Sequence, residues 1–218
     1  MRTTPLVDGS YYHVYNRGTE HRDVFLCDED RRRFLRGCIL FNDDEVIHKK
    51  PELIRDGSHP LHAENPLVSI IAYALMDNHI HFLLQQHGDN GLARFMQRLG
   101  TGYTKYFNRK YKRTGVLFES AYKSVPVEDD EQFLHVSRYI HLNPIDLFPL
   151  EQRNIVRLLT YPWSSLRHYV GQIIDPVVQD SPLLSMLSAE EHFDFVRDWI
   201  PQRRSKPDFG EENLSTLP

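Results

Sequence analysis

The sequence has little cysteine and no long apolar run. Its 218 residues include two cysteines, Cys27 and Cys38, whose spacing matches no zinc-binding pattern. This count excludes a disulfide scaffold, and we expect both residues to be small, partly buried thiols. The longest apolar run, residues 67–76, is about half of the ~20 residues that a membrane-spanning helix needs. The sequence therefore predicts a soluble protein with no membrane partner.

A secretion signal is also missing, since no basic segment followed by an apolar segment opens the sequence. We therefore expect the protein to be cytoplasmic. Glycine (11 residues) and proline (13 residues) are not enriched, and 40% hydrophobic with 26% charged residues is typical of a globular protein. The length predicts one domain with or without an extension, and it is too short for a comfortable (β/α)₈ barrel.

The chain as a whole has no excess of basic residues. Its net charge of -4 argues against a nucleic-acid partner, because proteins that bind nucleic acids are usually basic. The segment from Arg94 to Lys123 differs, with eight basic residues, one acid and a local charge of +7. Salt screens charges beyond roughly 8 to 10 Å, so a polyanion responds to this segment more than to remote acids. The basic residues are Arg94, Arg98, Lys105, Arg109, Lys110, Lys112, Arg113 and Lys123.

Hydrophobic periodicity predicts a mixture of strands and helices. The predicted elements are a strand at 11–17, a helix capped by Asp28, strands at 67–75 and 79–86, a helix at 91–111, a strand within 116–127 and a helix from Asp129 or Asp130 to near Asn143. This order predicts an α+β fold, a ferredoxin-like α/β sandwich with a mostly antiparallel sheet.

The predicted organisation is one main domain followed by an extension. We expect residues 1–150 to form the main domain, interrupted by a long surface loop at 42–66. Residues 151–201 are predicted to form a helical C-terminal extension, with one or two helices after Tyr161, and residues 202–218 a mobile tail. On the 91–111 helix, the basic side chains Arg94, Arg98, Lys105 and Arg109 fall within an arc of about 60°.

His79 and His81 are two residues apart on a predicted strand, so their imidazoles project from one face of the sheet. Two nitrogen ligands on one face are the beginning of a metal site. A pair of ordinary strand histidines is the alternative that this spacing leaves open. A metallo-β-lactamase-like site is disfavoured because Leu83 stands where an aspartate is needed, and an amidohydrolase needs a barrel that this length hardly permits.

Tyr139 and Asn143 are four residues apart on the last predicted helix and are therefore neighbours on its surface. Tyr139 lies beside the apolar stripe of Phe133, Val136 and Ile140, so its hydroxyl can reach a polar site at the sheet. Spacing alone leaves a second interpretation open, a tyrosine with a structural hydrogen bond and an asparagine that ends the helix.

Three ordered segments resemble a known family. MDNHIHFLL (76–84) resembles the histidine motif of single-tyrosine HUH transposases, and SRYIHLNPI (137–145) resembles their catalytic tyrosine segment. The intervening GYTKYFNRKYKRTGVLFESAYKS is similar to the same stretch in REP-associated tyrosine transposases. The resemblance covers residues 10–170 approximately and identifies residues 1–150 as a catalytic domain.

The resemblance implies a nuclease and strand transferase for single-stranded, hairpin-containing DNA. It implies that His79, His81 and Asn143 hold a divalent ion, Mg²⁺ or Mn²⁺, and that Tyr139 forms a 5′-phosphotyrosine intermediate. The basic residues of 94–123 would contact phosphates. A transposase of a mobile insertion sequence and a domesticated, non-cutting DNA-binding protein are the alternatives, and a homodimer is left open.

The sequence departs from the resembled family at three places. Asp77 stands where proline often precedes Asn-His, Ser120 and Ala121 replace a frequent Gly-Arg, and residues 146–148 replace a usual Arg-Ala-Gly. The second and third departures remove arginines, so they bear on DNA affinity more than on the chemistry.

Overall fold

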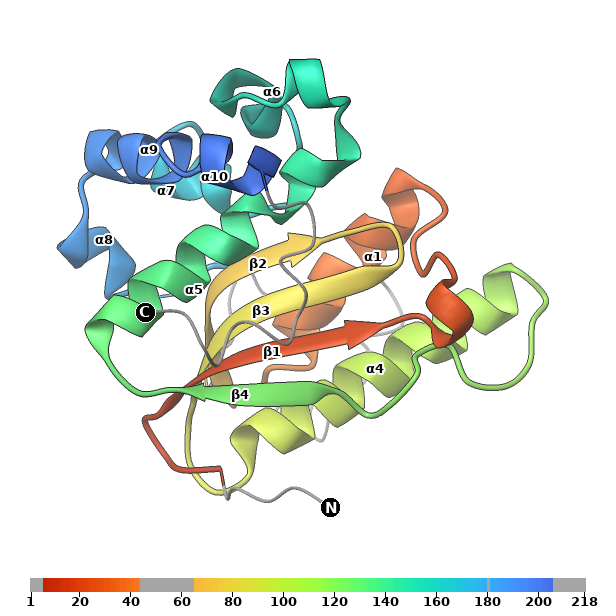
Figure 1. Cartoon of the computed structure of the whole chain (residues 1–218). Coiled ribbons are helices and arrows are strands. Elements are labelled where there is room, and N and C mark those ends of the chain that lie inside the picture. Colours follow the sequence, from red (N-terminus) through yellow and green to blue (C-terminus); the bar gives the residue numbers. More distant parts are fainter. Residues whose placement is uncertain (1–5, 44–64, 180, 206–218) are drawn as a thin grey trace.

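The fold is a four-stranded antiparallel sheet with helices on both faces (Figure 1). The computed structural model describes residues 6–43, 65–179 and 181–205. The strands are β1 (Tyr11–Arg17), β2 (Val68–Leu75), β3 (His79–Gln86) and β4 (Lys123–Val127), in the spatial order β2-β3-β1-β4. In the described part of the chain, an α-helix lies between β1 and β2 and another between β3 and β4, so this is the ferredoxin-like arrangement predicted from the sequence.

Two layers of helices cover the sheet. Helices α1 (Asp28–Leu40) and α4 (Gly91–Lys110) lie on one face, and α5 (Asp130–Leu142) lies on the other (Figure 1). Alternate residues of β3 follow this division. Ile80, Phe82 and Leu84 belong to the core beneath α1 and α4, whereas Leu83 belongs to the core beneath α5. The histidines of β3 have the parity of Leu83 and therefore face α5.

Helix α5 begins and ends as the sequence predicts. The side chain of Asp129 caps it by accepting a hydrogen bond from the backbone N–H of Gln132. A 3₁₀ turn, η2 (Asn143–Leu147), follows because Pro144 cannot continue the α-helix. Phe133, Val136 and Ile140 pack on the sheet.

The predicted cap of α1 is wrong. The N-cap residue is Cys27, which makes no side-chain cap hydrogen bond, and Asp28 is the first residue inside the helix. The carboxylate of Asp30 accepts a hydrogen bond from the backbone N–H of Leu26 instead, at 2.9 Å. Asp30 therefore stabilises the turn that leads into α1.

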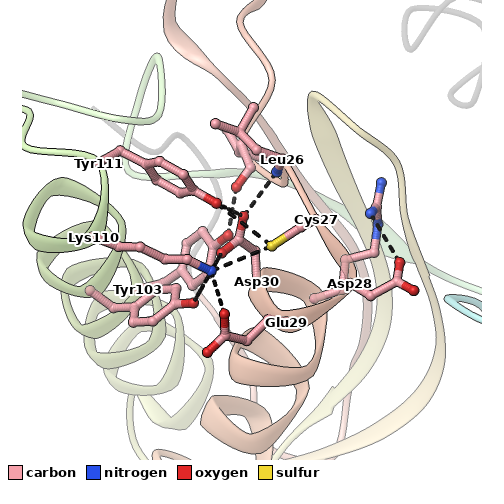
Figure 2. A network of polar contacts seen from close by, with 11 residues as sticks. Leu26, Cys27, Asp28, Glu29, Asp30, Tyr103, Lys110 and Tyr111 are labelled. Carbon is pink, nitrogen blue, oxygen red and sulfur yellow. Dashed lines mark hydrogen bonds and ion pairs between the residues drawn. The ribbon is translucent and has the colours of Figure 1, made fainter.

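Asp30 also joins α1 to α4 through a buried polar network (Figure 2). Its carboxylate accepts hydrogen bonds from Lys110 at 2.8 Å, Tyr111 at 2.7 Å and Tyr106 at 3.0 Å. Burial opposes ionisation of Asp30, but the hydrogen bonds from Lys110 and Tyr111 outweigh it and lower the pKa of the carboxyl group. The charge on Lys110 is therefore used to hold the fold together.

We expect Asp30→Asn to destabilise the protein by about 3 kcal/mol, because it leaves the Lys110 ammonium without its buried counter-charge. The free energy of unfolding in urea measures this effect. Glu29→Gln is the matched control, since Glu29 pairs with the same ammonium at 2.7 Å but is 71% exposed. We expect less than about 1 kcal/mol there. Equal losses in the two variants would contradict a role for the buried carboxylate.

The C-terminal region contains more and shorter helices than predicted. The described part has η3 (Leu150–Gln152), α6 (Ile155–Leu159), α7 (Leu166–Tyr169), α8 (Leu183–Met186), α9 (Ala189–Arg197) and α10 (Ile200–Ser205), besides η1 (Thr19–His21) near the N-terminus. The expectation of one or two helices fails because Gly171 and the prolines at 176 and 182 interrupt the chain.

The C-terminal region is joined to the sheet and to α5. Trp163 and Ser165 exchange backbone hydrogen bonds with Leu75 and Tyr73, which covers the outer edge of β2. Residues 202–205 of the predicted tail belong to α10, and residues 206–218 and 44–64 lie outside the described residues. No helix in the described ranges is both long and apolar enough to span a membrane.

Candidate active site

The face of the sheet beneath α5 carries a row of ring side chains at the end of β3. His79 pairs in register with Arg17 of β1, and His81 pairs with Tyr15. The rings of His79 and His81 are 5.0 Å apart between centroids, and the ring of Tyr15 stacks on His81 at 5.9 Å. The structure therefore brings the two predicted histidines together on one face.

Asn78 fixes the protonation pattern of His79. The amide oxygen of Asn78 lies 2.6 Å from Nδ1 of His79, and the Asn78 amide nitrogen donates to the carbonyl oxygen of His21. Because an amide oxygen only accepts, Nδ1 of His79 carries the proton. The lone pair then lies on Nε2, which is the atom that a metal ion needs.

His13, on β1, contacts His81, and no motif in the sequence marks it. Nε2 of His13 lies 3.0 Å from Nδ1 of His81, and both residues are buried. If Nδ1 of His81 donates this hydrogen bond, Nε2 of His81 is left as a ligand. The proton of His13 then lies on its Nδ1, a buried nitrogen that has no hydrogen-bond partner among the described residues.

The three histidines are held in the neutral form. Burial, followed by the charges of Arg17 and Arg203, lowers the pKa of His79 to about 4. Burial also lowers the pKa of His13 to about 3 and places the pKa of His81 well below its usual value. Neutral imidazoles bind metal ions and protonated ones do not, so this face suits a cation ligand at physiological pH.

Tyr139 reaches this group of histidines from α5. Its ring centroid lies 5.5 Å from the ring of His81 and 5.8 Å from that of His13, with both pairs nearly perpendicular. Phe133, Val136 and Ile140 hold the helix on the sheet, and Tyr139 is half-buried beside them. A phenol on a late helix is thus placed against two histidines of the sheet.

Asn143 lies one turn after Tyr139, at the end of α5. Its side-chain amide donates to the carbonyl oxygen of Tyr139 at 3.0 Å, and the residue is 5% exposed. This hydrogen bond uses the amide nitrogen, so the amide oxygen is the atom through which Asn143 can act as a metal ligand. The bond also supports the interpretation of Asn143 as a residue that ends the helix.

Two arginines approach the same face. Arg17 stands opposite His79, and the guanidinium carbon of Arg203 lies 5.5 Å from the centre of the Tyr139 ring. The sequence analysis singled out neither residue. Arg203 fell within the predicted tail, where no periodicity marks it.

The turn before His79 is held in place by backbone hydrogen bonds. The carbonyl oxygen of Asp77 accepts from the N–H groups of Val24 and Phe25, and that of Asn78 accepts from Gly18. The carboxylate of Asp77 forms an ion pair with Arg31. An aspartate therefore has a structural role where the resembled family often has proline.

The basic residues of α4 belong to a helix on the other face of the sheet. The core side of α4 packs against the sheet face opposite to α5 (Figure 1). The structure does not bring the arc of Arg94, Arg98, Lys105 and Arg109 together with the histidines. Lys110 pairs with Glu29 and Asp30, so its charge is already balanced by two carboxylates of α1.

The turn after α4 does come close to the histidine end of the sheet. The backbone of Leu117 accepts a hydrogen bond from Thr19, and Glu119 donates to the carbonyl oxygen of Arg17. Lys112 and Arg113 belong to the same turn, and Lys112 is exposed. Lys123, at the start of β4, places its ammonium 5.4 Å from the ring centre of Tyr15. Basic groups thus extend from α4 towards the site.

The residues present fit a divalent ion with few protein ligands. Within the described ranges, no group of three or more His, Cys, Asp or Glu side chains is arranged to hold a metal ion. The predicted ligands are two imidazoles, those of His79 and His81, and the amide oxygen of Asn143, all of them types that bind divalent ions. Such a set leaves coordination positions for substrate oxygens, as catalytic metal sites require.

Comparison with known proteins supports a relationship to single-tyrosine transposases. A model of the IS200-like transposase family matches residues 61–143, which include the two histidines of β3, Tyr139 and Asn143. This match confirms the resemblance found in the sequence, over less than half of the chain. The search of curated proteins found no match.

Among solved structures, the chain is similar to a REP-associated tyrosine transposase that is bound to a REP hairpin. The TM-score is 0.52, with 15% sequence identity over 83% of this chain and 90% of that chain. The likeness confirms the α+β fold and extends into the C-terminal helices.

Proposed function

We propose that this protein nicks single-stranded DNA beside a hairpin and transfers the cut strand through a 5′-phosphotyrosine intermediate. The observation that carries the proposal is the position of Tyr139, whose ring lies against His81 on the sheet face shared with His79. The family match over residues 61–143 supports the same chemistry. The hairpin is proposed because the similar solved transposase is bound to one.

The reaction is a phosphoryl transfer between oxygen atoms. Oη of Tyr139 attacks the phosphorus, and the P–O3′ bond breaks. The phenol gives its proton to solvent, and the departing 3′ oxygen takes a proton from solvent. The products are a 5′-phosphotyrosine and a free 3′ hydroxyl. Another 3′ hydroxyl reverses the step on a second strand, so no nucleotide cofactor is consumed.

His79, His81 and Asn143 are proposed to hold Mg²⁺ or Mn²⁺. When bound, the ion neutralises charge on the phosphate and stabilises the 3′ oxygen as it leaves. Asn78 keeps Nε2 of His79 unprotonated and oriented, and we propose that His13 does the same for His81 by accepting the proton of its Nδ1. All of these residues belong to one chain, so the proposed chemistry needs no second copy.

The proposed DNA surface combines the segment 111–119 after α4 with the basic residues of that helix. Lys112 and Arg113 lie in this segment, which reaches Arg17 through the backbone of Glu119, and Lys123 lies against Tyr15. The basic residues that continue the surface around α4 are Arg94, Arg98, Lys105 and Arg109. We propose that the cut strand follows the turn to Tyr139, and that the hairpin stem occupies the outer surface.

The test is a covalent-adduct assay with the full chain and Mn²⁺. The substrate is a pool of synthetic single strands, each with a hairpin of random stem and random flanks, labelled at either end. We expect a denaturation-resistant protein–DNA band from the 3′-labelled pool and a released fragment from the 5′-labelled pool. Chelation of Mn²⁺ and use of fully duplex DNA should both abolish the band.

Three results would contradict the proposal. The absence of a band with intact hairpin affinity would identify a binding protein that does not cut. A band only from the 5′-labelled pool would mean that the protein is joined to the 3′ end created by the break, as a 3′-phosphotyrosine. A band that survives chelation would exclude the metal dependence.

A further inference from the structure

The most distant part of the described chain supplies a cation to the candidate nucleophile. Arg203 belongs to α10, 64 residues after Tyr139 in the sequence, yet its guanidinium carbon lies 5.5 Å from the centre of that ring. The side chain of Arg203 is only 7% exposed. A buried arginine beside a candidate active site calls for an explanation, because arginine is rarely buried without a specific partner.

The partner that fixes Arg203 is Asp146 in η2, the turn that directly follows α5. One oxygen of Asp146 accepts hydrogen bonds from Nε of Arg203 at 3.0 Å and from Nη2 at 2.6 Å. These bonds use two of the five N–H donors of the guanidinium group. Asp146 thereby ties the side chain of Arg203 to the turn that directly follows the helix carrying Tyr139.

Helix α9 keeps α10 in position against α5. The guanidinium of Arg138 lies between the rings of Phe195 and Trp199, at 4.2 and 3.7 Å from their centres. Nδ1 of His141 contacts Nε2 of His192 at 3.1 Å, and both histidines are buried. Arg203 is therefore placed by packed elements on both sides.

The charge of Arg203 acts on both histidines of β3. It contributes to the lowered pKa of His79 and of His81, after burial and other nearby charges. With Arg17 opposite His79, two guanidinium groups influence the region between the phenol and the imidazoles. Guanidinium groups bind phosphate oxygens, like carboxylate oxygens, by paired hydrogen bonds.

We propose that Arg203 binds the phosphate group that Tyr139 attacks and holds the tyrosine ring in position for the attack. This role rests on the proposed function. In that reaction Arg203 is a catalytic residue, contributed by α10. Asp146 is its positioning residue. A cation at this place stabilises the additional negative charge that develops on the phosphate during transfer.

The chain offers a matched control in Arg153. It pairs with the other oxygen of the same carboxylate, at 2.9 Å, and its side chain is 12% exposed. Its guanidinium also donates to the carbonyl oxygen of Phe148 at 3.1 Å. If the ion pair with Asp146 were the whole role of Arg203, the same substitution at either position would have the same effect.

The experiment compares Arg203→Met with Arg153→Met in the full chain. The single-turnover rate of adduct formation, the affinity for the hairpin pool and the melting temperature are measured for each. We expect Arg203→Met to slow adduct formation about 100-fold and to change hairpin affinity by less than about 3-fold, since one transition-state contact is lost. Arg153→Met should stay within about 3-fold of the wild-type rate.

The lysine variants decide the matter if a methionine variant does not fold. Arg203→Lys keeps the charge and the ion pair but loses the planar fork. We expect it to react faster than Arg203→Met and at least about 5-fold more slowly than Arg153→Lys, with similar melting temperatures. Equal rates for the two positions, in either the methionine or the lysine pair, would overturn the proposal.

The wild-type chain separates failure of the Arg203 proposal from failure of the proposed function. If the wild-type chain forms no adduct, the proposed function fails and Arg203 loses this role with it. If the wild-type chain forms an adduct and the rates of the two variants are equal, only the Arg203 proposal fails.

Discussion

Tyr139→Phe is expected to reduce formation of the covalent protein–DNA adduct by at least about 1,000-fold, because the substitution removes the only atom proposed to attack the phosphate. The ring remains, and with it the contacts to His81 and His13. We therefore expect the melting temperature and hairpin affinity to stay close to those of the wild type. The measurement is a single-turnover adduct assay with Mn²⁺ and the 3′-labelled hairpin pool.

Two tyrosines of the same sheet face serve as controls. Tyr11 packs its ring against Phe133 of α5, with centroids 4.9 Å apart, at the far end of β1 from His79. Tyr11→Phe should leave the rate within about 2-fold, since its hydroxyl has no part in the proposed reaction. Tyr15 is the informative case, because its ring stacks on His81. An adduct that persists in Tyr139→Phe and disappears in Tyr15→Phe would assign the nucleophile to the strand instead of the helix.

The sequence predicts those parts of the site that depend on local periodicity. The alternation of β3 places His79 and His81 on one face, and the helical repeat places Tyr139 beside the apolar stripe of α5. Both patterns also say which side of the element faces the core. The proximity of Tyr139 to His81 then follows from packing α5 on the sheet.

Contacts that depend on strand register are not predictable in this way. His13 lies on a strand that the sequence predicts correctly at 11–17, with the parity of Tyr15 and Arg17. The predicted ferredoxin-like fold places β1 next to β3, but it does not give the register, in which His13 stands opposite Leu83 and Tyr15 opposite His81. Without that register, a histidine in YYHVYNR has no visible connection to His81.

The basic arc of α4 illustrates the opposite limit. Residues 91–110 form a helix, so the helical repeat groups Arg94, Arg98, Lys105 and Arg109 on one side. The apolar residues that pack on the sheet follow the same repeat on another side. Periodicity does not say which face of the sheet the helix covers. In the structure α4 and α5 lie on opposite faces of the sheet, so the helix with the basic arc is separated from the helix that carries Tyr139 (Figure 1).

His81→Phe is expected to lower the rate of strand cleavage by about 1,000-fold, and His13→Phe by about 10- to 100-fold, because the first loses a proposed metal ligand and the second loses the group that orients it. The phenylalanine ring retains the stacking that His13 and His81 make with each other and with Tyr15. His13→Phe removes one buried nitrogen without a hydrogen-bond partner in the described part of the chain, but it leaves Nδ1 of His81 without its own partner, so we expect a loss of stability of about 1–3 kcal/mol. The melting temperature, measured beside the rate, separates a loss of activity from unfolding.

Mn²⁺ binding by His81→Phe and His13→Phe is a second measurement beside the rate of cleavage. We expect Mn²⁺ affinity, followed by the paramagnetic resonance of the free ion, to fall below detection in His81→Phe and by about 10- to 100-fold in His13→Phe. His13→Gln should recover most of the affinity, because its amide oxygen accepts the hydrogen bond from Nδ1 of His81. Unchanged Mn²⁺ affinity in His13→Phe would show that His81 binds the ion through Nε2 without the hydrogen bond to His13. Unchanged affinity in His81→Phe would mean that this face of the sheet does not hold the ion.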